Sequence, residues 1–503
     1  MAIATPSKAE QVRRKLSHPV IDADGHLLEI APVFFDFLKE VGGAKMVEKF
    51  QARQKPGPGF FDHTASTGWF DMTPKERRDS GTMAPFWWFM PTTDTRYRMT
   101  AHLPRVFYDR LDEFGIDFEV TFGTTSVAFG AIPGIQDEEL RKACCRAFNN
   151  YIAELYEDYK DRLTPAAVVP MHTPEEAIEE LTHIKKLGLK AAMFPSYVVR
   201  EVKREPGNER IADGLLAPWH MDFFGIDSDY DYDPVWAKCV EVGIAPCFHG
   251  TANGIIWGSR NSPSNLMYNT VGNFAESGDA VSKSLFMSGV SRRFPRLRMA
   301  FLEGGVGRGM LTWEGMIEFW KKRNPKAMEK NLNPKNLDLD QAMRLVEDYG
   351  EPRMKAHMDE IRQFFEGIRA APTPDIEGLD DWYRAKIAKP EDFKTLYQDN
   401  FFWGCEADDP TVIWAFAGDV NPRGMKFRAF MGSDISHCDV TDPTDVLPEA
   451  YEFVEDGHMS DEDFKDFVFG NAVRLYGGMN PDFFKGTPVE AEAAKVLAGD
   501  RGR

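Results

Sequence analysis

The sequence predicts an α/β protein: a (β/α)₈, TIM-like barrel with a long aromatic-rich insertion after its first strand and a helical insertion after its sixth. Two observations support this fold. From residue 105 onward, short apolar runs alternate with amphipathic stretches of helical length, as in parallel strands joined by crossover helices. The chain has 503 residues, 43% of them hydrophobic, which suits one large barrel that carries insertions.

The expected elements follow in order along the chain. A β-branched run at 18–26 predicts the first strand. The stretch 105–123 predicts a helix that ends at Gly115 and then a strand. Thr173 and Gly188 have the residue types expected at the two ends of a helix. The remaining strands are expected within 163–171, 188–196, 244–251, 297–305, 399–410 and 427–437, and the remaining helices within 137–163, 230–243, 285–297 and 460–477.

These elements define one main domain at 19–490, between an N-terminal arm at 1–18 and a C-terminal tail at 491–503. Residues 31–104 and 309–395 break the strand–helix rhythm and are expected to be insertions. In the first insertion, aromatic side chains are expected either to cover a pocket as a lid, or to fix the loop to the body or bury a subunit contact. They are Trp69, Phe86, Trp87, Trp88 and Phe89.

Charge and composition exclude several classes of function. The formal net charge is -19, which argues against nucleic acid or a membrane surface as a partner, because phosphate binding needs a basic surface. The six cysteines form no CxxC pair, and the N-terminus lacks the apolar core of a signal peptide. No apolar run is long enough to span a bilayer. We therefore expect a soluble, cytoplasmic protein with reduced cysteines.

Residues able to bind a metal stand at the ends of three predicted strands. Asp22, Asp24 and His26 alternate along the first strand, so they can share one face. His249 ends the fifth strand, and Asp434 ends the eighth. Each alone also has a structural explanation, such as a polar strand end or a capped loop. Because strand ends converge at the mouth of a barrel, the three together predict a metal site there.

The sequence resembles the amidohydrolase superfamily, in the amidohydrolase-related (amidohydrolase 2) group that includes metal-dependent decarboxylases. The resemblance implies metal ligands at Asp24, His26, His249 and Asp434. In a hydrolase mechanism, Asp434 is also expected to act as a general base. It spans about 19–480 without the insertions. The motifs that carry it are IDADGH (21–26), FHG (248–250), LEGG (302–305), GSDISH (432–437) and NAVRLYG (471–477).

Two positions depart from the pattern of this group. Asp24 stands where many members have the first histidine of an HxH motif. Glu303 stands where many decarboxylases of the group have a histidine, so the expected site is richer in carboxylates. Glu303 is expected either to bind or orient the metal or to hold the loop that follows it. His437 is a candidate catalytic residue, as a further ligand or substrate contact, and a structural role is the alternative.

These residues predict a metal-dependent hydrolase or non-redox decarboxylase of a small organic molecule, with a bound Zn, Mn or Fe ion activating water. The missing strand-6 histidine weakens the decarboxylase branch. One alternative is an O₂-activating monooxygenase component with two Fe or Mn ions and a reductase partner. Another is a non-catalytic subunit that partners a paralogous enzyme. The chain is expected to form a homo-oligomer, or a hetero-oligomer with such a paralogue.

Overall fold

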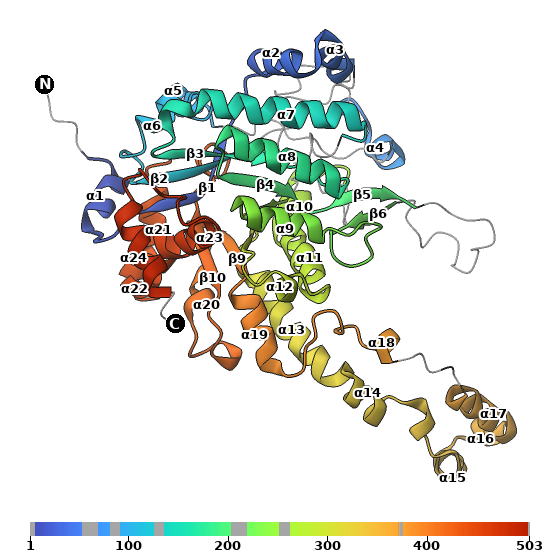
Figure 1. Ribbon diagram of the computed structural model, residues 1–503. Coiled ribbons are helices and arrows are strands. Elements are labelled where there is room, and N and C mark those ends of the chain that lie inside the picture. The colour runs from blue at the N-terminus through green and yellow to red at the C-terminus, as the bar shows by residue number, and fades with distance from the viewer. Residues whose placement is uncertain are drawn as a thin grey trace, which may run out of the picture.

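Eight parallel strands form one sheet in the order β1-β2-β3-β4-β7-β8-β9-β10, which confirms the predicted barrel (Figure 1). The computed structural model describes residues 6–52, 69–80, 91–124, 135–202, 219–250, 262–370, 372 and 376–500. The barrel strands are β1 (Ile21–Leu27), β2 (Phe118–Gly123), β3 (Leu163–Val168), β4 (Ala191–Pro195), β7 (Pro246–His249), β8 (Met299–Phe301), β9 (Phe401–Glu406) and β10 (Arg428–Gly432).

The barrel closes between its first and last strands at their carboxyl ends. The backbone N–H of Asp434 donates to the carbonyl oxygen of Asp24 at 3.0 Å, and that of His26 donates to Ile435 at 3.2 Å. Gly432 permits this approach, because a Cβ at that position would lie 2.7 Å from the Cβ of Asp24. The closure brings together the carboxyl ends of β1 and β10, where two of the predicted ligand motifs lie.

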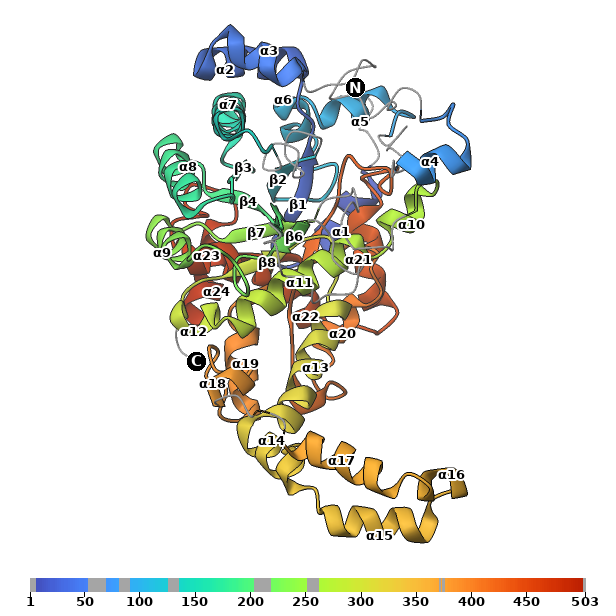
Figure 2. The ribbon, with the colours of Figure 1, turned by 90° about the vertical axis from the view of Figure 1, so that its right-hand side faces the viewer.

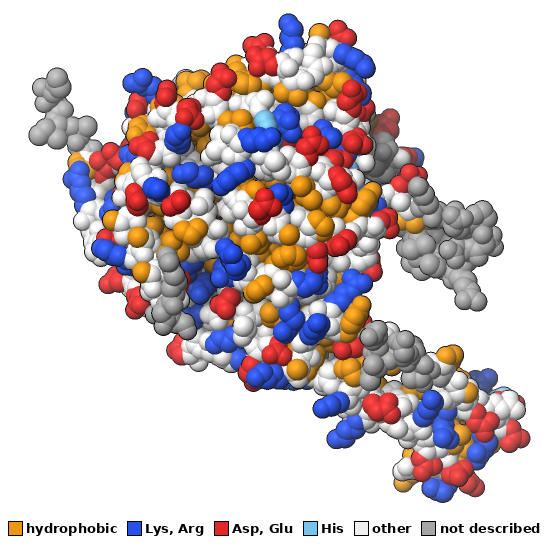
Figure 3. Space-filling view, viewed as in Figure 1, with side chains coloured by type: hydrophobic (Ala, Val, Ile, Leu, Met, Phe, Trp, Pro, Cys, Tyr) orange, Lys and Arg blue, Asp and Glu red, His pale blue; other side chains and the backbone are white. Residues whose placement is uncertain are grey.

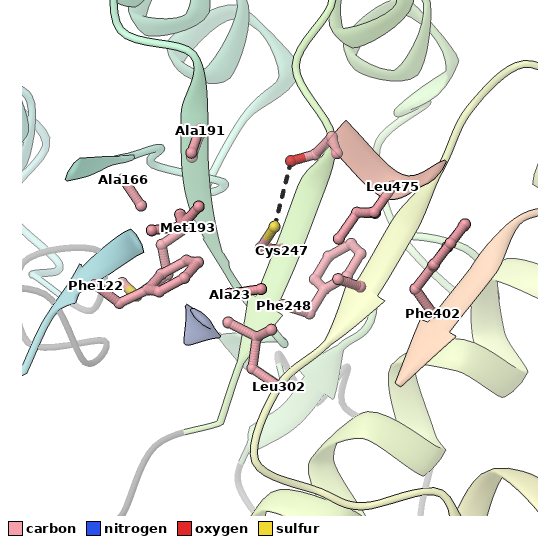
Figure 4. Packing of buried hydrophobic residues seen from close by; sticks show 14 of the residues in the cluster. Ala23, Phe122, Ala166, Ala191, Met193, Cys247, Phe248, Leu302, Phe402 and Leu475 are labelled. Atoms are coloured by element: carbon pink, nitrogen blue, oxygen red, sulfur yellow. Dashed lines mark hydrogen bonds between the residues drawn. The ribbon is translucent and has the colours of Figure 1, made fainter. Parts of the chain in front are cut away.

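The barrel interior is packed with apolar side chains from neighbouring strands. Figure 4 shows Phe122 close to Met193 on one side of the cluster and Phe248 close to Leu475 on the other, and all four are almost completely buried. Cys247 lies among them and contacts the hydroxyl of Tyr476 at 3.7 Å between Sγ and oxygen. This core supports the polar residues at the carboxyl ends of the same strands.

Helices surround the sheet in the sequence order expected for crossover connections. Thr173 Oγ1 accepts a hydrogen bond from Glu176 N at 3.2 Å and Gly188 has φ +77°, so both predicted helix ends are confirmed. The helices around the barrel and at the termini are α1 (Lys8–Lys15), α6 (Pro104–Tyr108), α7 (Glu138–Leu155), α8 (Pro174–Leu187), α9 (Asp233–Val242), α10 (Leu266–Thr270), α11 (Asn273–Met287), α12 (Val290–Arg293), α20 (Val412–Phe416), α21 (Val446–Glu455), α22 (Asp461–Lys465), α23 (Asn471–Met479) and α24 (Glu490–Asp500).

Three elements differ from the sequence prediction. The helix expected up to Gly115 ends at Tyr108, and turns follow it. The helix expected at 285–297 is divided between α11 and α12 by Gly289, which has φ +80°. An antiparallel hairpin, β5 (Val198–Glu201) and β6 (Trp219–Asp222), lies after β4 and was not predicted. In the first two cases a local turn overrides a periodic apolar pattern.

The insertions after the first and sixth strands are confirmed. The described part of the first contains α2 (Ala31–Gly42), α3 (Ala44–Ala52), α4 (Pro74–Ser80) and α5 (Thr95–Thr100). Trp69 is buried, and its Nε1 donates to the carbonyl of Pro263 at 3.3 Å. The aromatic residues at 86–89 lie outside the described residues. The second insertion contains α13 (Gly307–Arg323), α14 (Pro325–Asn331), α15 (Leu339–Tyr349), α16 (Pro352–Lys355), α17 (Met358–Arg369), α18 (Ile376–Leu379) and α19 (Pro390–Gln398).

A helix that spans a bilayer must be both long and predominantly apolar. Within the described ranges, none combines sufficient length with sufficient apolar character to cross a membrane.

Candidate metal centre

Five predicted side chains converge at the carboxyl end of the barrel. His26 Nε2 lies 2.7 Å from Asp434 Oδ1, 3.2 Å from Glu303 Oε1 and 4.0 Å from Asp24 Oδ1. His249 Nε2 lies 3.4 Å from Glu303 Oε1 and 4.0 Å from Asp24 Oδ1. The structure therefore brings together all five residues for which the sequence predicted a metal-binding role. The role of each remains a prediction.

Each of these donors lies on a barrel strand or shortly after one. Asp24 and His26 belong to β1, and His249 is the last residue of β7. Glu303 and Asp434 each lie two residues beyond a strand, with φ of +54° and +53°. This left-handed conformation is costly for residues other than glycine and is often found at functional sites. Here it accompanies two carboxylates at the mouth of the barrel.

His437 extends the cluster on the side of Asp434. Its Nδ1 lies 2.6 Å from Asp434 Oδ1, and its Nε2 lies 3.2 Å from the hydroxyl oxygen of Thr124. The rings of His437 and His26 stack with centroids 3.8 Å apart. A neutral His437 that carries its proton on Nδ1 satisfies both contacts, since it donates to the carboxylate and accepts from the hydroxyl. Thr124 was not predicted from the sequence.

Burial and charge together set the protonation of the cluster. Burial raises the pKa of Asp24 to about 8, and burial together with the Asp434 carboxylate raises that of Glu303 to about 8. Burial would also raise the pKa of Asp434, but His437 and His26 outweigh it and hold the pKa well below its usual range. Burial opposes the charged form of His26, yet Asp434 and Glu303 raise its pKa well above the ordinary value.

The other two imidazoles are neutral near physiological pH. Burial lowers the pKa of His249 to about 4 and that of His437 to about 4. A neutral imidazole is the form that binds a metal ion. His249 is therefore ready to act as a ligand without first losing a proton.

The geometry and the donor types fit a divalent metal ion. Metal–ligand bonds of about 2.1 Å place neighbouring donor atoms roughly 3–3.4 Å apart and opposite ones roughly 4.2 Å apart. The separations from His26 and His249 to Glu303 and Asp24 fall in this range. Asp24 Oδ1 is buried and has no hydrogen-bond partner in the described part of the chain. Imidazole and carboxylate donors suit Zn, Mn or Fe.

Asp22 and Glu119 form a pair of buried carboxyl groups next to the site. Asp22 was expected to share a face with Asp24, but its Oδ1 instead accepts hydrogen bonds from the backbone N–H of Ser433 at 2.9 Å and of Asp24 at 3.2 Å. The register in which β1 pairs with β2 shifts between Asp22 and Gly25. Burial and Asp22 raise the pKa of Glu119 on β2 well above its usual value. Glu119 followed no recognisable motif, so sequence reasoning missed it.

An acidic pocket adjoins the metal centre. Asp434 lines it, and within the described residues Glu406, Asp434 and Asp439 form a second group with closely spaced carboxylate oxygens. Burial and Asp434 raise the pKa of Asp439 to about 8 and that of Glu406 to about 9. The pocket is open to solvent on one side and has a cavity volume of about 70 Å³. Its other acidic residues are Asp408, Asp442, Asp445 and Glu449.

His172, Arg308 and Lys190 lie outside this cluster. The side chain of His172 is buried, and its backbone carbonyl accepts from Arg200 at 2.8 Å. Arg308 pairs with Glu276 at 3.4 Å. Lys190 donates to the carbonyl of Phe483 at 2.9 Å.

A comparison with known families agrees with the metal-binding geometry of the site. A family model described as Amidohydrolase matches residues 21–325, which is more than half of the chain. The chain belongs to the amidohydrolase family. This amidohydrolase is accordingly a metal-dependent enzyme, and the family predicted from the sequence is confirmed.

Three solved structures are similar to this chain, and the first of them supports the fold. An amidohydrolase from Mycobacterium avium subsp. paratuberculosis has a TM-score of 0.51 at 18% identity, covering 92% of this chain and 100% of that one. A 2,6-dihydroxybenzoate decarboxylase from Rhizobium has a TM-score of 0.46 at 15% identity, covering 91% and 98%. A 5-carboxyvanillate decarboxylase from Novosphingobium aromaticivorans, solved with manganese, has a TM-score of 0.46 at 14% identity, covering 92% and 96%.

Proposed function

We propose that this amidohydrolase hydrolyses a C–N or C–O bond in a small organic molecule that carries no negative charge at the reacting group. The observation that carries the proposal is the donor set: three carboxylates and two imidazoles meet at the mouth of the barrel, with Asp24 Oδ1 buried and without a hydrogen bond in the described part of the chain. Asp24, His26, His249 and Glu303 would hold the ion, and Asp434 lies at its edge.

A divalent ion held by these four residues would supply an acidified water, with a pKa lowered toward ~7, and would polarise a substrate carbonyl. Asp434 accepts the proton of the attacking water, because its low pKa keeps it ionised. The water oxygen bonds to the carbonyl carbon, the C–N or C–O bond breaks, and Asp434 passes the proton to the departing nitrogen or oxygen.

The residues around Asp434 support this role. His437 donates to Oδ1 from one side and is itself held by Thr124, so the carboxylate is fixed in orientation. Asp439 forms a side-chain hydrogen bond with Asp434, and its raised pKa keeps it protonated at neutral pH. Asp439 therefore donates to the base and connects it to the acidic pocket.

Charge favours hydrolysis over decarboxylation. A dipositive ion surrounded by ionised Asp24, Glu303 and Asp434 leaves the site with an excess of negative charge, and the adjoining pocket adds further carboxylates. A carboxylate substrate would approach against this field. A neutral amide, ester or lactone, or a substrate with a cationic group, would not.

The oxygenase alternative requires two ions, one of them iron, together with a reductase. Glu406, Asp434 and Asp439 are near enough to offer further oxygen ligands, but the family match lends it no support. The non-catalytic alternative is disfavoured because all four proposed ligands and the proposed base Asp434 are present and close together.

The test is purification without added metal, followed by elemental analysis and activity assays. We expect about one Zn or Mn per chain and metal-dependent hydrolysis in a panel of neutral amides, esters and lactones. Release of CO₂ from aryl carboxylates without any hydrolysis would replace the proposal with decarboxylation. Two ions that include iron, with O₂ consumed only when a reductant is present, would replace it with oxygenation.

A further inference from the structure

A tyrosine of the first insertion contacts the loop that carries the proposed base. We define the base loop as residues 433–440, which directly follow β10. Tyr97 lies on α5 of the first insertion, which Figure 2 shows beside β1. Its hydroxyl accepts a hydrogen bond from Ser436 N at 2.9 Å and donates to the carbonyl oxygen of Val440 at 2.8 Å. One side chain therefore holds the backbone of the base loop at two positions.

The base loop has a backbone conformation that needs support from outside the loop. Asp434 has φ +53° and Ser436 has φ +99°. Residues other than glycine rarely adopt such angles unless the surrounding structure imposes them. β1 holds the first half of the loop, because the backbone N–H of Asp434 donates to the carbonyl oxygen of Asp24 at 3.0 Å. The Tyr97 hydroxyl holds the second half.

His437 lies between the two positions that the hydroxyl contacts. Its Nδ1 is 2.6 Å from Asp434 Oδ1, which is the contact that orients the proposed base. The backbone N–H of His437 also donates to the carbonyl oxygen of Asp434 at 3.1 Å, and that of Val440 donates to His437 at 3.2 Å. Tyr97 thus fixes both ends of the short segment that presents the His437 side chain to Asp434.

Water has little access to this contact. Tyr97 and Ser436 are each 3% exposed, in contrast to the charged side chains of both signs on the face that Figure 3 draws. A buried backbone group that loses its partner carries the cost of its desolvation. Without the hydroxyl, the base loop must leave the N–H of Ser436 unsatisfied or change its conformation.

The body of the protein holds α5 in place, so α5 can support another segment. Thr100 is the last residue of α5, and its Oγ1 accepts a hydrogen bond from Arg110 Nη1 at 3.0 Å. The next carbonyl oxygen, that of Ala101, accepts from Leu28 N at 2.8 Å. Because Leu28 directly follows β1, these bonds fix Tyr97 relative to the strand that carries Asp24 and His26.

We propose that Tyr97 is a positioning residue for hydrolysis: its hydroxyl fixes the base loop so that His437 holds Asp434 in the orientation that accepts a proton from the attacking water. The inference rests on the proposed function, because that function makes Asp434 the base. A displacement of about 1 Å at a reacting group can cost about 10²-fold in rate. The first insertion thereby supports the reaction through a side chain that acts by way of His437 and Asp434.

The test is Tyr97→Phe, which removes the hydroxyl and keeps the ring. We expect kcat to fall by about 10–100-fold. KM should stay within about twofold, and the metal content should not change, because the four proposed ligands are untouched. Hydrogen exchange followed by mass spectrometry should show that peptides of the base loop exchange about tenfold faster than in the wild-type chain, since two hydrogen bonds are lost.

The matched control is Tyr397→Phe in the second insertion. Tyr397 is also buried, and its hydroxyl donates to the carbonyl oxygen of Gly309 at 2.9 Å, so this variant loses a comparable hydrogen bond elsewhere in the chain. It should change neither kcat nor the exchange of the base loop. Thermal unfolding of both variants establishes that each is folded at the temperature of the assay.

The outcomes distinguish the positioning role from the proposed function. An unchanged kcat in Tyr97→Phe would overturn the positioning role, as would an equal loss of kcat in Tyr397→Phe, which would indicate an effect of stability alone. The exchange measurement needs no substrate. If the wild-type chain hydrolyses nothing in the panel of neutral substrates, the proposed function fails. Unchanged exchange of the base loop in Tyr97→Phe would instead show that the hydroxyl does not hold that loop.

Discussion

At the scale of single residues, protons on the buried side chains limit the net negative charge of the metal centre before any ion binds. Asp24 and Glu303 have pKa values raised to about 8, so both are largely protonated at neutral pH. His26 has a raised pKa and Asp434 a lowered one, so these two form an ion pair. The buried cluster thereby avoids an excess of negative charge, and an incoming ion must displace the protons.

This balance predicts a steep dependence of metal affinity on pH. Three groups of raised pKa hold protons below about pH 8, and binding releases those protons, so affinity must increase as pH rises. We expect roughly a tenfold or greater increase for each pH unit from about pH 6 to about pH 8. Competition with a chelator at each pH measures it. An affinity that does not change over this range would contradict the proposed ligands.

Asp434 gives a second prediction at this scale. Asp434→Asn keeps the size of the side chain but cannot accept a proton, so kcat should fall by about 10²–10⁴-fold. Asp24, His26, His249 and Glu303 remain, so most of the metal should be retained. The control is Asp442→Asn in the adjoining pocket, which should affect kcat little. Equal losses of kcat in both variants would show that Asp434 contributes charge alone and not base catalysis.

At the scale of elements, the seam between β1 and β10 holds the site together. A methyl group on Gly432 would overlap the Cβ of Asp24 at 2.7 Å, so Gly432→Ala must separate the two strands. We expect it to lower the free energy of unfolding by about 1–3 kcal/mol and to weaken metal binding.

The control for this seam is another glycine. A Cβ on Gly315 in α13 would meet no atom within 4 Å, so Gly315→Ala should be neutral or should stabilise by up to about 1 kcal/mol. Chemical denaturation measures both variants. Equal stability of the two would mean that the seam adjusts without strain.

Sequence reasoning reached the strand-end residues but not their neighbours, and the reason is physical. Asp24, His249 and Asp434 end apolar strands, and a barrel must bring such ends together. Asp439 lies beyond the strand end in a loop, Glu119 lies on β2 and Thr124 directly follows β2, and no motif marks any of the three. Their proximity depends on loop conformation and barrel register, which periodicity does not encode. For the same reason, the β5–β6 hairpin was missed while all eight barrel strands were found.

At the scale of the whole molecule, the metal centre joins distant parts of the chain. Its four proposed ligands come from β1 and β7 and from a residue that follows β8, so an ion bound there would link three strands, with Asp434 after β10 at its edge. An unfolded chain does not hold these donors together, so binding should stabilise the folded state. With free metal at a hundred times its dissociation constant, the gain is about 2.7 kcal/mol.

Removal of the metal should therefore lower the Tm of the intact chain by several degrees, and restoring Zn or Mn should reverse the change. His249→Ala removes one imidazole ligand, and the metal-dependent shift should largely disappear in this variant. The matched control is His458→Ala, which removes a histidine outside the cluster and should leave the shift intact. Scanning calorimetry of the three proteins, each with chelator and with metal, makes the comparison. If His249→Ala kept the full shift, the stabilising ion would bind elsewhere in the molecule, and the barrel mouth would lose its assignment as the metal centre.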